Sequence, residues 1–303
     1  MLRAALLLAC ACAGLRAEAA GCADTARRPV DDARIRAAID EAHRQHRLFG
    51  GQVIERNGGL FRIGYHEAEW DRPPGDSTPT WERVATFWQA LSPAEPPLVI
   101  TSAGLVARAE AERAGTGEAE VAVREALLRA AIVDTPWSAA FISYLMKTAG
   151  FSAEEFEFSD SHADYVQAAF ETSAAEAAGQ ATRHAFRACD VATTKPRAGD
   201  LLCATRATAA GVARFDALAT VMATRDRGRA FPMHCELVVR SDERGDAKLE
   251  TIGGNVVQSV TLSRMTLNAR KVLGDAYVMH AVPATPPRHL SRRPWVVLLQ
   301  FRN

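Results

Sequence analysis

The chain has no excess of either charge, because its 303 residues contain 36 Lys and Arg against 36 Asp and Glu. It also lacks a basic cluster, an internal repeat and a long low-complexity tract. A nucleic-acid-binding surface needs concentrated positive charge, since phosphates supply most of the attraction. We therefore expect no nucleic-acid partner. The hydrophobic fraction of 48% is that of an ordinary globular protein with a substantial core.

Cysteine is scarce in the part of the chain expected to fold. Three of the six cysteines fall within the first 22 residues, which leaves Cys189, Cys203 and Cys235. No Cys-x-x-Cys pair occurs, and the spacing matches neither a zinc site nor a disulfide-rich scaffold. We expect no metal and no cofactor. Three cysteines predict a free thiol or one pair plus a remainder. Cys203 and Cys235 could form that pair or stay as two buried thiols.

Long hydrophobic runs are absent except at the amino terminus. Residues 4–13 are apolar and follow Arg3, and Ala17-Glu18-Ala19 has the small residues that a signal peptidase requires. The run is too short for a permanent membrane helix. We expect residues 1–19 to be a signal peptide, export to the periplasm or cell envelope, and no transmembrane segment after cleavage. The adjacent Cys22 leaves a lipid anchor open.

Helical patterns come first along the chain and strand patterns follow. The expected helices are 31–48, 79–91, 118–133, 136–149 and one beginning near Ser159 or Ser161. A hairpin is expected over 52–69, and the expected strands are 200–204, 234–240, 248–252, 253–262, 276–282 and 295–301. This order favours an α+β fold with an antiparallel sheet. We expect an extension of helices and a hairpin over 24–117 and a core over 118–303. The insertion 205–232 could be a lid or a packed surface helix.

The segment 134–150 predicts a buried helix with a reactive position in its first turn. Apolar residues cover nearly all of its sides, Pro136 suits the first helical position, and Gly150 suits the stop. Ser138 then lies where free N–H groups and the helix dipole favour developing negative charge. A nucleophile is suited to this place, although serine is also a common helix-capping residue.

The order of several blocks along the chain resembles a known family. The blocks are Pro136–Ser143, Ser161–Tyr165, Pro196–Cys203, His234–Val239 and Ile252–Val256. They are similar to the bacterial family called domain of unknown function 2272 over roughly residues 80 to 302. Their order also resembles papain-like cell-wall hydrolases, the NlpC-type peptidases and CHAP amidases. This resemblance implies a papain-like core. In it a nucleophilic Cys opens a helix, a His begins a strand, and a polar residue on the next strand orients that His.

Serine replaces the expected cysteine, which changes the chemistry required. A serine must lose its proton to a neutral histidine as it attacks, since its hydroxyl does not ionise. By resemblance, Ser138 is the nucleophile, His234 the general base and Asn255 the residue that orients His234. Glu236 is the alternative orienting group, because residues two apart on a strand share a face. The expected substrate is an amide or ester, with peptidoglycan or another envelope polymer as the partner.

Two neighbouring residues have alternative interpretations. His162 could be a second base or a substrate contact, or it could cap a helix at the surface. Trp137 belongs to the core, with one edge available to the cleft. A metal site using His162, His234, Cys203 and Glu236 has suitable residue types but no recognisable ligand spacing.

Two other functions stay open. The chain could be a non-catalytic papain-like domain that binds a wall fragment or an envelope partner. It could also be a structural protein in which these polar residues form a buried hydrogen-bond network. Solvent access to Ser138 separates these possibilities, since a sealed serine neither reacts nor binds.

Overall fold

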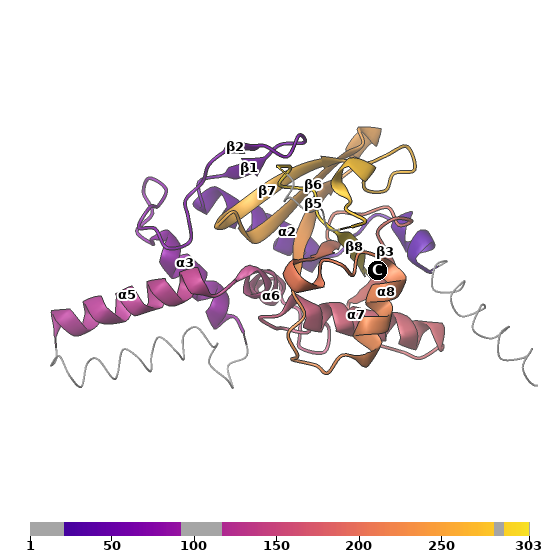
Figure 1. Ribbon diagram of the computed structural model, residues 1–303, viewed down its shortest axis with the longest axis horizontal. Helices are drawn as coiled ribbons and strands as arrows, with labels where there is room; N and C mark the ends of the chain where they lie inside the picture. The colour runs from indigo at the N-terminus through magenta and orange to yellow at the C-terminus, as the bar shows by residue number, and fades with distance from the viewer. Residues whose placement is uncertain (1–20, 92–116, 282–287, 303) are drawn as a thin grey trace, which may run out of the picture.

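The computed structural model describes residues 21–91, 117–281 and 288–302, and it combines helices with one large sheet (Figure 1). The α-helices are α2 (Ala33–Leu48), α3 (Thr80–Gln89), α5 (Glu118–Asp134), α6 (Ser138–Thr148), α7 (His162–Ala177) and α8 (Phe215–Thr224). The strands are β1 (Gln52–Ile54), β2 (Leu60–Arg62), β3 (Phe186–Asp190), β4 (Leu201–Thr205), β5 (Met233–Ser241), β6 (Lys248–Val256), β7 (Ser259–Thr266) and β8 (Trp295–Phe301). The predicted α+β class is confirmed.

The eight strands form one sheet in the order β2-β1-β7-β6-β5-β4-β8-β3. Neighbouring strands are antiparallel except β1 and β7, which run parallel. The sheet is therefore mixed, whereas the sequence predicted an antiparallel one. The difference arises because the amino-terminal hairpin β1–β2 extends the sheet at β7. A long excursion through the rest of the chain separates β1 from β7, and only such a crossover can join parallel neighbours.

Two predicted strands were wrong. The expected strand 253–262 is divided, because Val257 and Gln258 have φ of 50° and 61° and form a tight turn between β6 and β7. Of the expected strand 276–282, residue 282 lies outside the described residues, and residues 276–281 contribute part of a 3-10 turn and an isolated bridge from Val278 to Arg293. Strand β3 was missed, since it is five residues long and carries both an arginine and an aspartate.

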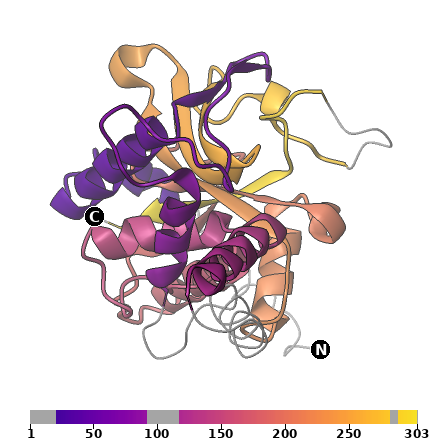
Figure 2. The same cartoon turned by 90° about the vertical axis from the view of Figure 1, so that its left-hand side faces the viewer.

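Helices α6 and α7 cover the face of the sheet where the main core lies (Figures 1 and 2). Helix α6 contacts β5 and β6, and α7 contacts β3 and β5. The apolar residues on nearly every side of α6 are explained by this position between the sheet, α2 and α3. The insertion 205–232 packs as a helix, α8, on α7, with Phe215 against Phe170.

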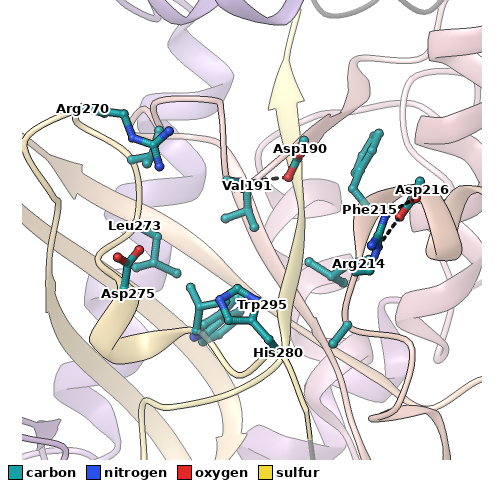
Figure 3. Close-up of a pocket in the computed structure, with 15 residues that line it drawn as sticks. Asp190, Val191, Arg214, Phe215, Asp216, Arg270, Leu273, Asp275, His280 and Trp295 are labelled. Carbon is teal, nitrogen blue, oxygen red and sulfur yellow. Dashed lines mark hydrogen bonds and ion pairs between the residues drawn. The ribbon is translucent and has the colours of Figure 1, made fainter.

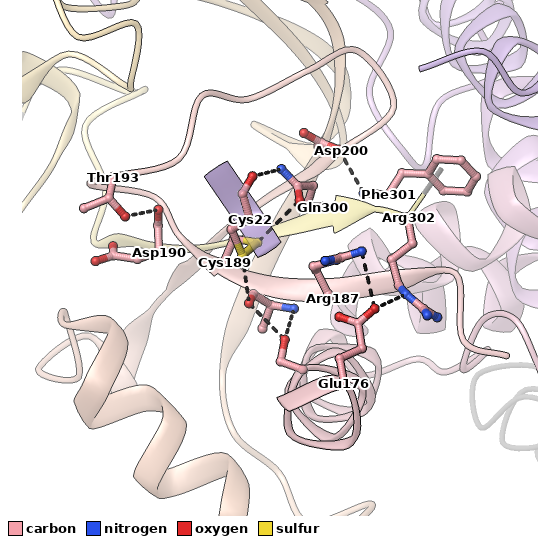
Figure 4. Close-up of a disulfide and its surroundings, with 12 residues drawn as sticks. Cys22, Glu176, Arg187, Cys189, Asp190, Thr193, Asp200, Gln300, Phe301 and Arg302 are labelled. Atoms are coloured by element: carbon pink, nitrogen blue, oxygen red, sulfur yellow. Dashed lines mark hydrogen bonds and ion pairs between the residues drawn. A yellow bond between two sulfur atoms is a disulfide. The ribbon is translucent and has the colours of Figure 1, made fainter. Parts of the chain in front are cut away.

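Two disulfides resolve the cysteine question. Cys203 bonds to Cys235 across β4 and β5, where the two residues are directly paired. Cys22 bonds to Cys189 on β3, so the described cysteines are even in number (Figure 4). A sulfur atom in a disulfide cannot also carry a thioether-linked lipid, which disfavours the lipid anchor at Cys22.

The signal peptide expected over residues 1–19 lies outside the described residues. Within the described ranges, none of the helices has both the length and the apolar character needed to cross a bilayer.

Candidate functional site

Ser138 is the first residue of helix α6, and its side chain faces a histidine. The preceding residue, Trp137, is the N-cap and makes no side-chain capping bond. The helix therefore begins two residues later than Pro136, and the N–H groups of its first turn lack intrahelical acceptors. Ser138 Oγ lies 2.7 Å from Nε2 of His162, the first residue of α7. Two helix starts thus bring this pair together.

The hydrogen bonds around His162 determine which ring nitrogen carries its proton. Nδ1 is hydrogen-bonded to the hydroxyl of Tyr165, which is fully buried. Among the described residues this hydroxyl has no other acceptor, so Tyr165 donates to Nδ1. Nε2 then carries the proton and donates to Ser138 Oγ. This arrangement leaves the hydroxyl proton of Ser138 available to a different base.

A second histidine, His234, is held by a carboxylate at the start of β5. Its Nε2 lies 3.3 Å from Glu236 Oε1, and an ionised carboxylate can only accept, so Nε2–H donates. Arg293 Nη1 donates to the same oxygen at 3.0 Å, and Thr251 Oγ1 donates to Glu236 Oε2 at 2.5 Å. Burial alone would raise the pKa of Glu236, but the charge of Arg293 and these bonds lower it to about 2. Glu236 is therefore ionised at neutral pH.

Both histidines are neutral at neutral pH. Burial is the main cause that lowers the pKa of His234 to about 4, and the charge of Arg293 adds to it. Burial also holds the pKa of His162 well below its usual value, with smaller effects from His234 and Arg206. The two rings meet edge to face with centroids 5.3 Å apart. His234 Nδ1 has no hydrogen-bond partner among the described residues.

Asn255 makes no hydrogen bond to His234, contrary to the expectation that it orients this histidine. Its amide nitrogen donates to Glu67 Oε2 at 3.1 Å, and its oxygen accepts from the Trp137 backbone N–H at 3.2 Å. The reason is an irregularity near the end of β6, where the register shifts between Gly253 and Val256 and Asn255 has a φ of 53°. Its side chain is therefore directed to the start of α6. Glu236, the alternative orienting group, is the residue that is hydrogen-bonded to His234.

Trp137 belongs wholly to the core. It is 0% exposed, packs against Phe49 and Phe87, and donates from Nε1 to Glu67 Oε2 at 2.8 Å. No edge is left for a cleft. Cys235 also lies in the core, where its disulfide removes Cys203 from the metal-ligand set considered from sequence. In the described part of the chain, no cluster of three or more His, Cys, Asp or Glu is placed to hold a metal ion.

Sequence reasoning missed four members of this site. They are Tyr165, Thr251, Arg293 and Glu67. Tyr165 could have been found, because it follows His162 by three residues and so shares its helix face. Arg293 could not, since it lies 57 residues from Glu236 in a segment without a motif.

A separate pocket of about 320 Å³ is lined by none of Ser138, His162 and His234 (Figure 3). Trp295 lines it, together with charged residues that include Asp190, Arg214 and Asp275. The guanidinium of Arg293 lies 5.4 Å from the Trp295 ring centroid and also bonds to Glu236. Arg293 therefore links the wall of this pocket to Glu236.

Comparison with known proteins identifies the family. No curated protein and no solved structure matches the chain. The family model described as "Uncharacterized protein conserved in bacteria (DUF2272)" matches residues 75–301, which include Ser138, His162 and His234 but not Glu67. The chain therefore belongs to the DUF2272 family.

Proposed function

We propose that this protein is a hydrolase or acyl-transfer enzyme that acts on an amide or ester through Ser138. One observation carries the proposal: Ser138, at a helix start, is hydrogen-bonded to His162, and the His162 ring meets a neutral His234 that is held by ionised Glu236 and whose Nδ1 has no partner among the described residues. This charge state is the one that a serine nucleophile requires of its base. The free N–H groups of the first turn of α6 would stabilise the oxyanion.

The proposed reaction divides the work between the two histidines. Ser138 Oγ attacks the carbonyl carbon while its proton passes to His234 Nδ1. The imidazolium that forms on His234 is stabilised by Glu236, and it then protonates the leaving amine or alcohol. His162 donates to Ser138 Oγ and holds it in place. Water, or another nucleophile, releases the acyl group in the second half of the reaction.

A cell-envelope substrate is part of the same proposal. Two disulfides suit an oxidising compartment such as the periplasm. The order of the sequence blocks resembles that of peptidoglycan hydrolases. We therefore propose export and an amide or ester in peptidoglycan or another envelope polymer.

A non-catalytic binding domain is the second candidate, and burial favours it. Ser138, His162 and His234 are 2%, 4% and 5% exposed, respectively. Catalysis therefore requires that substrate binding opens the site and brings Ser138 and His234 together. If the site never opens, the same residues form a buried polar network, and the domain can only bind a wall fragment or an envelope partner elsewhere on its surface.

Labelling by a fluorophosphonate, which reacts with activated serines, tests the proposal. The wild-type protein should form an adduct at Ser138 that peptide mass spectrometry locates, and Ser138→Ala should form none. His234→Gln should slow labelling by about 10²-fold or more, the typical contribution of a general base. Thr148→Ala, a change at an exposed residue at the other end of α6, is the control and should label normally.

A screen of peptidoglycan digests and model esters completes the test. Products that form over time with the wild type and not with Ser138→Ala support an enzyme. An unlabelled wild-type protein without such products would exclude the enzyme and favour the non-catalytic domain.

A further inference from the structure

A second pocket opens at the amino-terminal end of helix α6, on the side where Glu67 lies. Its volume is about 330 Å³, and its walls are the loop after β2, the end of α5 and the turn between β6 and β7 (Figure 1). The residues that line it are His66, Glu67, Ala68, Glu69, Trp70, Asp71, Arg129, Val133 and Gln258. None of these side chains takes part in the proposed reaction.

Glu67 connects this pocket to the nucleophile. Its Oε2 accepts hydrogen bonds from Trp137 Nε1 and from the amide of Asn255, and Asn255 in turn accepts from the Trp137 backbone N–H. Trp137 is the residue before Ser138 in the chain. A ligand group bound at Glu67 therefore lies beside the first turn of α6.

The second carboxylate oxygen of Glu67 is available to a ligand. The residue is only 4% exposed, yet it lines the pocket, and its Oε1 has no hydrogen-bond partner among the described residues. Burial raises the pKa of Glu67, because the ionised carboxylate loses hydration there. A cation in the pocket would restore the missing counter-charge.

The remaining walls also favour a cation. Three lining residues are acidic, and the one permanently charged base, Arg129, is already occupied. Its guanidinium donates twice to the carbonyl of Ala68 and pairs with Glu125 at 3.4 Å. The guanidinium of Arg129 already lies 5.5 Å from the centroid of the Trp70 ring. The indole is nevertheless 50% exposed, so the part of the ring that Arg129 leaves uncovered can meet an ammonium group.

We propose that this pocket binds a protonated primary amine of the substrate, with the ammonium group on Glu67 Oε1. The substrate class becomes an amide or ester that carries an alkylammonium group near the scissile bond. The substrate assignment rests on the proposed function, but binding of the amine does not require turnover.

Calorimetric titration of the full chain with two lysine derivatives tests the inference. Nα-acetyl-lysine methylamide carries the ammonium group, and its Nε-acetyl counterpart lacks it. The wild type and Ser138→Ala should both prefer the charged ligand. Glu67→Gln keeps acceptors for Trp137 and Asn255 but loses the charge, and it should weaken the charged ligand by about tenfold or more. Glu243→Gln, which removes an exposed charge from the turn after β5, is the control and should bind normally.

A surface variant guards against misfolding of Glu67→Gln. Trp70→Ala alters an exposed side chain and should weaken the charged ligand by about two- to fivefold. Equal affinity for the two ligands, or unchanged affinity in both variants, would overturn the inference. Fluorophosphonate labelling of Ser138 without preference for the amine would leave the enzyme proposal standing and reject only this pocket. Amine binding without labelling would support the pocket and count against the enzyme proposal.

Discussion

Burial controls the charge of individual side chains at this site. His234 and Glu236 are adjacent on one face of β5, yet their pKa values move so that the carboxylate is charged and the imidazole is neutral. Arg293 is the residue that makes this combination stable, because its guanidinium neutralises Glu236 while it repels a proton from His234. A serine nucleophile benefits from this charge state, whereas a cysteine thiolate would be better matched by an imidazolium.

The lowered pKa of His234 predicts a loss of stability in mild acid. The unfolded chain binds a proton near pH 6.5 and the folded chain only near pH 4, so the unfolding free energy falls as pH drops between these values. The contribution of His234 is up to about 3 kcal/mol. Urea titrations at pH 7 and pH 4.5 should show a smaller loss for His234→Gln than for the wild type.

His162 and Glu236 do not reverse the sign of this effect. The pKa of His162 is lowered in the same direction, so part of the acid sensitivity should remain in the variant. Glu236, with a pKa of about 2, loses its contribution mainly below pH 4.5. An identical acid response in wild type and His234→Gln would show that His234 titrates normally.

Close packing between elements places the start of α6 against β6. Gly253 and Gly254 occupy the strand where it passes α6 and Glu236. A Cβ atom at Gly254 would lie 2.6 Å from the Cβ of Phe141 and 2.8 Å from Cζ3 of Trp137. A Cβ atom at Gly253 would lie 2.7 Å from Cγ of Glu236. These glycines allow the strand to approach both the nucleophile helix and the orienting carboxylate.

Gly254→Ala should therefore displace the start of α6. Overpacking of this kind typically costs about 1–3 kcal/mol, and the shift should also reduce fluorophosphonate labelling of Ser138. Gly211→Ala is the control, because nothing lies within 4 Å of the added atom. Thermal unfolding and labelling rates measured on both variants check the prediction. A Gly254→Ala protein as stable and reactive as the wild type would contradict it.

The amino-terminal segment is attached to strands β3 and β8 by a disulfide and a hydrogen bond. Besides the disulfide of Cys22 to Cys189, the carbonyl of Cys22 accepts from Gln300 Nε2 at 3.0 Å (Figure 4). The Arg197 guanidinium also donates to the carbonyl of Thr25. The disulfide links residues 167 positions apart and so restricts a large part of the unfolded chain.

Removal of this disulfide should lower the stability of the entire fold. The double change Cys22→Ser with Cys189→Ser is expected to cost about 2–5 kcal/mol of unfolding free energy. Urea denaturation of oxidised protein measures the effect, and the same variant under reducing conditions controls for the remaining disulfide. Unchanged stability would mean that this disulfide does not contribute to the unfolding free energy.

The sequence by itself determined the α+β class, the family and most of the helices. These depend on local patterns: apolar periodicity, the stop at Gly150 and blocks of residues in a fixed order. The same patterns predicted that Ser138 would open a buried helix and that His234 would begin a strand. Such features are encoded within a few neighbouring residues, so they can be recognised before any contact is known.

Only the tertiary structure decided which side chains meet. It placed His162 on Ser138, Glu236 and Arg293 at His234, and Asn255 at the start of α6. It also joined Cys22 to Cys189 and inserted β1 beside β7. Each of these pairings except His234 with Glu236 joins segments distant in sequence. Their partners depend on how strands and helices pack. They also depend on the left-handed backbone conformation of Asn255, which the local sequence pattern does not reveal.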